Sequence, residues 1–282
     1  MRMARSLSAV VIVPLALMML PDRAGAADCG RARDLQAQAR EMTPKQRLDL
    51  LESAAAQCED DPSILIDLAE AEVVVGNPNL AMRRFQQVAE TAQDVCQRAR
   101  ALAGLGRVYR LQGEKTDAVQ YLRSSLKLCP DPAVEADLLE LQWTARGAIV
   151  GADEIRGALQ PRSAGVEPGI DLQVNFESNS FRLSPQGRTQ VDEVARVIES
   201  PELRDARIRL IGHTDQRGSD DYNLRLSEQR AQSVRSYLIE VHGAAGNRLV
   251  AEGRGKREPL YRENNERAWA MNRRVEIAVG GR

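Results

Sequence analysis

An aspartate and an arginine near the C-terminal end are placed so that they could hold a ligand of mixed charge. Asp215 follows an apolar run typical of a strand, and Gly212 and Gly218 allow a tight loop around it. Arg230 falls on the helical stretch that follows, and its planar guanidinium suits a carboxylate in bidentate geometry. The alternative is a structural salt bridge between Asp215 and Arg230 that closes a turn, because surface pairs of this kind are common and weak.

Asn223 precedes Arg230 by about two helical turns. A continuous helix from about Ser219 to Val241 would place both side chains on one face. If the helix instead begins at Ser227, Asn223 belongs to the loop and still points toward the same place. The sequence leaves both interpretations open.

The segment 170–282 alternates between short strands and helices. Residues 170–176 alternate apolar and polar side chains, as a half-buried strand does. Ser184 and Pro185 open a helix that ends before Pro201. Further strands are expected at 207–212, 249–252 and 275–279. Strands that alternate with helices predict a two-layer α/β domain over residues 170–282.

Residues 27–145 carry a different pattern, with helical periodicity interrupted at regular places. In the run from Ala101 to Pro132, Gly113 separates two apolar stripes, and the small side chains of Gly106 and Ala118 would let two helices approach closely. A degenerate copy begins near Leu65, and a weaker unit spans residues 29–62. This helix-turn-helix pattern resembles the tetratricopeptide repeat, whose unit is about 34 residues. We therefore expect all-α helical-hairpin repeats, which offer a concave surface to a partner protein.

The four cysteines all lie in this helical half and allow three pairings. In an antiparallel hairpin, the start of the first helix lies beside the end of the second. Cys29 and Cys58 occupy those places in the first unit, and Cys96 and Cys129 occupy them in the last. The expected disulfides are therefore Cys29–Cys58 and Cys96–Cys129, with free thiols as the alternative.

The N-terminus has the three parts of a secretory signal peptide. Two arginines precede an almost wholly apolar run from Leu7 to Leu20, and small residues close the segment 1–26. The apolar run is shorter than the ~20 residues that span a bilayer, which disfavours an uncleaved anchor. Asp28 directly before Cys29 disfavours a lipid anchor. We expect a mature chain that begins at Ala27 outside the cytoplasm and has no transmembrane segment.

Between the helical region and the α/β domain, glycines and prolines interrupt the periodicity over residues 146–169. We expect this segment to be a linker.

The C-terminal segment also carries a family resemblance. The sequence IGHTDQRGSDDYNLRLSEQRAQSVRSYL at 211–238, together with NRRVEI at 272–277, resembles the OmpA-like peptidoglycan-binding domain that Pal and MotB share. The resemblance implies non-covalent binding of the diaminopimelate-containing stem peptide of peptidoglycan, without catalysis. Arg273 and Arg274 fall on opposite faces of the last strand, so one is expected to be structural and the other stays open.

The resemblance also assigns roles to individual side chains. It implies that Asp215 binds the ammonium of the stem peptide, that Arg230 binds the carboxylate on the same carbon, and that Asn223 supplies further hydrogen bonds. Thr214 and the backbone of Arg217 are expected to line the same pocket. An ammonium and a carboxylate on one carbon need such a fixed anion and cation a few ångströms apart.

Composition excludes several other classes of protein. The chain has 282 residues, is 43% hydrophobic and 28% charged, and carries a formal net charge of -1, so no chain-wide basic surface for nucleic acid is expected. Its two histidines and four cysteines do not cluster at metal-ligand spacing, so we expect no bound metal, no cofactor and no enzymatic activity.

The favoured hypothesis is a periplasmic, wall-associated envelope protein, with peripheral contact to the outer membrane left open. The alternative is an assembly scaffold in which the repeats carry the main function and wall binding only localises it.

Overall fold

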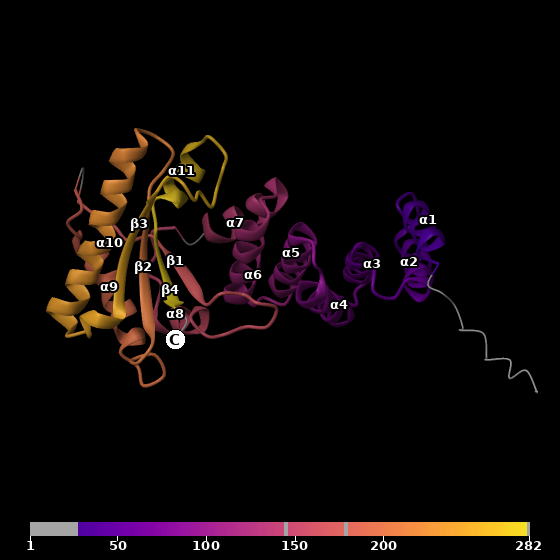
Figure 1. Ribbon diagram of the computed structural model, residues 1–282, viewed down its shortest axis with the longest axis horizontal. Helices are drawn as coiled ribbons and strands as arrows, with labels where there is room; N and C mark the ends of the chain where they lie inside the picture. Colours follow the sequence, from indigo (N-terminus) through magenta and orange to yellow (C-terminus); the bar gives the residue numbers. More distant parts are fainter. Residues whose placement is uncertain (1–27, 144–145, 178–179, 281–282) are drawn as a thin grey trace, which may run out of the picture.

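The computed structural model describes residues 28–143, 146–177 and 180–280. Helical hairpins extend away from an α/β domain along the long axis of the molecule (Figure 1). The expected signal peptide, residues 1–26, lies outside the described residues. No helix in the described part of the chain is long and apolar enough to cross a membrane.

The N-terminal region is a row of antiparallel helical hairpins followed by a single helix. Thr43 caps the second helix, which begins at Pro44 as a first-turn proline favours. Gly76 and Gly113 take positive φ angles of 88° and 81° at the equivalent turns of two hairpins. The helices are α1 (Cys29–Ala39), α2 (Pro44–Gln57), α3 (Pro62–Val74), α4 (Pro78–Thr91), α5 (Val95–Leu111), α6 (Lys115–Leu128) and α7 (Pro132–Trp143).

Two disulfides and one close helix contact hold these hairpins. Cys29 is bonded to Cys58 and Cys96 to Cys129, the pairs that the hairpin geometry favours. A Cβ atom on Gly106 would lie 2.7 Å from the Cγ atom of Leu122, so only glycine allows α5 to pack this closely on α6. The expected close approach at this position is confirmed.

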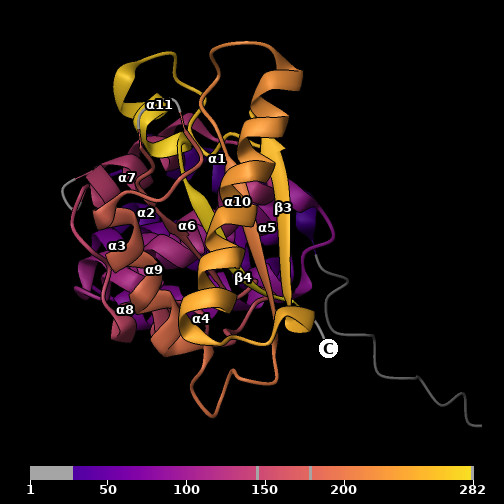
Figure 2. The ribbon, with the colours of Figure 1, turned by 90° about the vertical axis from the view of Figure 1, so that its left-hand side faces the viewer.

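The C-terminal region contains a four-stranded sheet whose strands run in the order β1-β4-β2-β3. β1 and β2 each pair antiparallel with β4, and β3 pairs parallel with β2. Helices α9 and α10 cover one face and bury the apolar side of every strand (Figure 2). The expected two-layer α/β architecture is confirmed. The elements are β1 (Gly169–Leu172), α9 (Pro185–Ile198), β2 (Arg207–His213), α10 (Asp220–His242), the 3₁₀ turn η1 (Gly246–Arg248), β3 (Leu249–Gly255), α11 (Glu266–Asn272) and β4 (Val275–Gly280).

The first strand is shorter than the alternation of residues 170–176 predicts. It ends at Leu172, because the backbone N–H of Val174 donates to the carbonyl of Leu172 at 3.0 Å and turns the chain. Phe176 then forms an isolated antiparallel bridge with Leu183 instead of continuing the sheet. The apolar side of the alternation still faces the core beyond Leu172, because Val174 is buried in the same apolar cluster as the strands and Phe176 packs against it.

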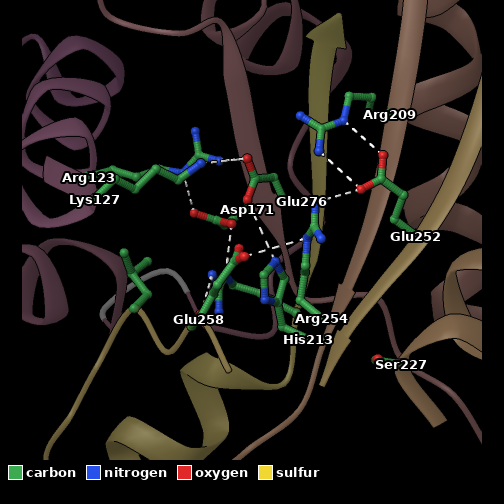
Figure 3. A network of polar contacts seen from close by, with 12 residues as sticks. Arg123, Lys127, Asp171, Arg209, His213, Ser227, Glu252, Arg254, Glu258 and Glu276 are labelled. Atoms are coloured by element: carbon green, nitrogen blue, oxygen red, sulfur yellow. Dashed lines mark hydrogen bonds and ion pairs between the residues drawn. The ribbon is translucent and has the colours of Figure 1, made fainter. Parts of the chain in front are cut away.

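The second face of the sheet is charged, and α6 covers part of it. Arg123 from α6 is 2% exposed and lies 2.6 Å from Asp171 of β1 and 2.5 Å from Glu276 of β4. Lys127, one turn further along α6, contacts the same Glu276 at 2.7 Å (Figure 3). The side chains of Asp171 and Glu276 point away from the apolar core because they alternate with its residues along their strands. The helical region therefore docks on the α/β domain through buried ion pairs.

An apolar cluster extends this docking. Leu122 and Leu138 of the helical region share a buried cluster with Leu260 and Tyr261, which precede α11. Two backbone N–H groups, those of Arg262 and Glu263, donate to the carboxylate of Glu135 on α7. Within the expected linker 146–169, residues Ala152–Ala158 form α8, which packs against α9. Helices and sheet thus form one continuous packed body across the described residues.

Candidate functional site

The start of α10 is placed by its contact with β2. A Cβ atom on Gly212 would lie 2.1 Å from the carbonyl oxygen of Ser227, so the helix crosses the strand at backbone contact. Ser219 caps the helix by accepting from the backbone N–H of Tyr222. α10 runs unbroken from Asp220 to His242, so Asn223 and Arg230 lie on one helix. This is the continuous helix from about Ser219 that the sequence allows, and not the shorter helix beginning at Ser227.

The carboxylate of Asp215, in the loop between β2 and α10, is held by two arginines. Its Oδ1 accepts from the backbone N–H and the Nε of Arg217 at 3.0 and 3.2 Å. Its Oδ2 accepts from Nη2 of Arg217 at 2.7 Å and from Nη1 of Arg273 at 2.8 Å. Burial alone would raise the pKa of Asp215, but hydrogen bonds from these two residues outweigh it and lower the pKa to about 2. Asp215 is therefore a fixed anion at neutral pH.

Other predicted residues brace the loop. The side-chain amide of Asn223 donates to the carbonyl of Arg217 at 2.6 Å, and the backbone N–H of Thr214 donates to the carbonyl of Gly255 at 2.9 Å. The guanidinium of Arg217 lies 4.7 Å from the centre of the Trp269 ring, and its side chain is 54% exposed. Asn223 and Thr214 thus fix the backbone around Asp215, whereas the Arg217 side chain is more exposed and is held by Asp215, Glu266 and the Trp269 ring.

A cavity of about 510 Å³ opens beside this loop. Arg230 and Arg273 line it, together with Phe176 and His213, and no aspartate or glutamate is among its lining residues. Of the five predicted residues only Arg230 lines the cavity itself, and Asp215 is joined to the cavity through Arg273. The cavity wall therefore carries cationic side chains, and the anionic carboxylate of Asp215 lies behind Arg273, next to the cavity.

Arg230 is oriented by an aromatic ring rather than by a carboxylate. Its guanidinium lies 4.9 Å from the centre of the Phe176 ring, and its Nε is buried without a hydrogen-bond partner. Burial lowers the pKa of Arg230 from its ordinary value. Asp215 and Arg230 form no ion pair with each other within the described part of the chain. The alternative of a turn-closing salt bridge between them is thus not the arrangement found.

The floor of the cavity is fixed by the charged sheet face. His213 lies 3.6 Å from Glu276, and burial, with Arg274 nearby, lowers the pKa of its imidazole, which keeps it neutral at pH 7. Arg123, His213 and Lys127 hold the pKa of Glu276 well below its usual range despite burial. Arg274 donates to Asp171 at 2.8 Å, so Arg274 is the structural member of the Arg273–Arg274 pair.

Sequence reasoning did not find every residue of the site. The alternation of residues 170–176 predicts Phe176 within a strand, yet Phe176 leaves the sheet and its ring lies against the guanidinium of Arg230. Arg273, whose role the sequence leaves open, contacts both Asp215 and the cavity. Trp143, at the end of α7, also lines the cavity, although it belongs to the helical region. No cluster of histidine, cysteine and acidic side chains suited to a metal ion occurs over the described ranges.

Comparisons with known proteins identify relatives of the C-terminal region. The OmpA family profile matches residues 175–273. Outer membrane protein A of Bordetella avium is 35% identical over 143 residues, which cover 49% of this chain and 72% of that protein. The peptidoglycan-associated lipoprotein of Pseudomonas aeruginosa is 36% identical over 102 residues, covering 36% of this chain and 58% of that one. The crystal structure of the peptidoglycan-associated lipoprotein from Burkholderia pseudomallei aligns with a TM-score of 0.34 at 29% identity, covering 38% of this chain and 88% of that one. The chain belongs to the OmpA family.

Proposed function

We propose that this protein binds peptidoglycan non-covalently in the periplasm, through the diaminopimelate residue of the stem peptide. One observation carries the proposal: a cavity lined by Arg230 and Arg273, with the ionised carboxylate of Asp215 at its side. The free end of diaminopimelate carries an ammonium and a carboxylate on one carbon. Asp215 would take the ammonium, and Arg230 would take the carboxylate through the outer nitrogens of its guanidinium, which lines the cavity.

Ligand binding at Asp215 requires an exchange of partners. The carboxylate already accepts four hydrogen bonds, which is about its full capacity. The exposed Arg217 side chain is the partner most readily displaced, whereas its backbone N–H stays in place through the Asn223 contact. The ligand ammonium would then take the position that the Arg217 guanidinium occupies. Each charge-assisted hydrogen bond contributes roughly 1.5–3 kcal/mol, so a single site of modest affinity is expected, with avidity on a polymer.

Co-sedimentation with isolated sacculi tests this proposal. The mature chain 27–282 should pellet with sacculi, and Arg230→Gln should abolish pelleting because it removes the cation while preserving a polar side chain. Arg225→Gln is the matched control, since Arg225 is an exposed arginine on the same helix and is not among the residues lining the cavity. Equal pelleting of the Arg230→Gln variant and the wild type would contradict the proposal.

We also propose that the helical hairpins farthest from the sheet, formed by α1 to α4, bind a protein partner in the envelope. The support is apolar exposure on neighbouring helices: Val74 at the end of α3 is 67% exposed and Leu80 on α4 is 40% exposed. A photo-crosslinking residue at Val74 of the full chain should give a discrete adduct in cells. The same residue at Val241, which is 58% exposed on α10, serves as the control. No adduct at Val74, or identical adducts at both positions, would contradict a partner-binding role.

A further inference from the structure

One wall of the cavity comes from the end of the helical region and the start of the linker, not from the OmpA-like domain. Trp143 is the last residue of α7, and Arg146 and Gly147 follow it closely in the chain. All three line the same cavity as Arg230 and Arg273. Docking of α6 and α7 on the sheet brings this wall into place, through the buried contacts of Arg123.

The arginines on the cavity wall differ in their partners. Arg273 is paired with Asp215, and Arg274 is paired with Asp171. Neither Arg230 nor Arg146 has a carboxylate partner within the described part of the chain. Arg274 adds a buried Nη1 atom that lacks a hydrogen-bond partner. The cavity thus presents two unneutralised cations on different walls, Arg146 from the linker and Arg230 from α10, which suits a ligand with two anionic groups.

Arg146 is held against this wall by an aromatic ring. Its guanidinium lies 4.9 Å from the centre of the Trp143 ring. Arg267 of α11 stacks on the same ring at 4.8 Å, but Arg267 is not among the residues that line the cavity. Both arginines are exposed, so either can be replaced without disturbing the core. The two positions therefore form a matched pair, one facing the ligand cavity and one outside it.

We propose that Arg146, the first linker residue, held by Trp143 of the helical region, is a second carboxylate-binding subsite of the cavity, so that residues outside the OmpA-like domain take part directly in binding the stem peptide. The proposal rests on the proposed function, since it assigns a second contact to the same ligand. Arg230 binds the carboxylate beside the ammonium, and Arg146 binds a further carboxylate of the same peptide. This contact is partly exposed and is therefore weakened by added salt.

Calorimetric titration of the mature chain with a soluble Ala–Glu–diaminopimelate peptide tests the subsite. Two amidated forms of the peptide are compared with it. One lacks the free carboxylate of glutamate, and the other lacks the diaminopimelate carboxylate that is not on the carbon bearing the free ammonium. The wild type should bind the unmodified peptide about tenfold more tightly than one of the amidated forms. Arg146→Gln should weaken binding of the unmodified peptide about tenfold and remove that discrimination. Arg267→Gln should leave both quantities within about twofold of wild type.

The outcomes separate the two proposals. If Arg146→Gln keeps the affinity and the discrimination of the wild type while Arg230→Gln loses binding, the second subsite is wrong and peptidoglycan binding stands. If Arg267→Gln matches Arg146→Gln, the effect belongs to the Trp143 stack and the subsite is again wrong. A wild-type chain that binds none of the peptides overturns the proposed function and this inference with it.

Discussion

Replacing Arg123 by methionine should destabilise the whole protein strongly. Arg123 is 2% exposed and lies 2.6 Å from Asp171 and 2.5 Å from Glu276, whose side chains are 3% and 6% exposed. The substitution preserves most of the side-chain volume but leaves two buried carboxylates with one cation fewer. Breaking a buried ion pair from one side costs about 3–5 kcal/mol, because the desolvated charge that remains is uncompensated. Arg274 and Lys127 still contact these carboxylates, so we expect the lower end, about 3 kcal/mol.

Urea unfolding followed by circular dichroism measures this effect. Lys127→Met is the matched control, since Lys127 contacts the same Glu276 at 2.7 Å but its side chain is 37% exposed. The ammonium of Lys127 is partly in water and Arg123 still neutralises Glu276 in this variant, so its loss should be clearly smaller than that of Arg123→Met. A loss in Arg123→Met no larger than the loss in Lys127→Met would refute the reasoning that burial of the network determines its importance.

Three further predictions concern the loop and the hairpins. Arg217→Ala should bind the stem peptide several-fold more tightly, because the ligand no longer displaces a guanidinium from Asp215, and titration showing weaker binding would contradict this. The pKa of Asp215 is lowered from 3.8 to about 2, so its contribution to stability is present above pH 4 and is lost as the pH falls toward 2. The difference in unfolding free energy between wild type and Asp215→Asn should therefore be constant above about pH 5 and shrink below about pH 4, and a pH-independent difference would argue against the assigned shift. Replacing both Cys96 and Cys129 by serine opens a loop of sequence separation 33 and should cost about 2–4 kcal/mol in thermal or urea unfolding, whereas an unchanged midpoint would contradict a stabilising disulfide.

The elements that position the site follow from local signals in the sequence. Ser219 and Ser184 precede helices that begin where capping residues predict. The hairpin interpretation pairs Cys96 with Cys129 because it places helix ends side by side, and the structure contains that bond. These features depend on neighbours in the chain, which a single sequence displays directly.

Features that depend on tertiary packing were beyond the sequence. Arg123 lies in an amphipathic helix where an arginine normally faces solvent, yet α6 packs on the charged face of the sheet and buries it. The polar alternation at Asp171 is typical of a solvated sheet face, but Arg123 of the docked α6 covers Asp171 and buries it. Trp143 and Arg146 reach the cavity only because α7 docks beside α11, which no local pattern predicts.

The most direct test of the central claim replaces diaminopimelate by lysine in an otherwise identical soluble stem peptide. Lysine keeps the ammonium but lacks the carboxylate on the same carbon, so it removes the group assigned to Arg230. We expect the wild-type chain to bind the lysine peptide at least about tenfold more weakly than the diaminopimelate peptide, and Arg230→Gln to bind both peptides equally weakly. Equal affinity of the wild type for the two peptides would contradict recognition of the carboxylate by Arg230.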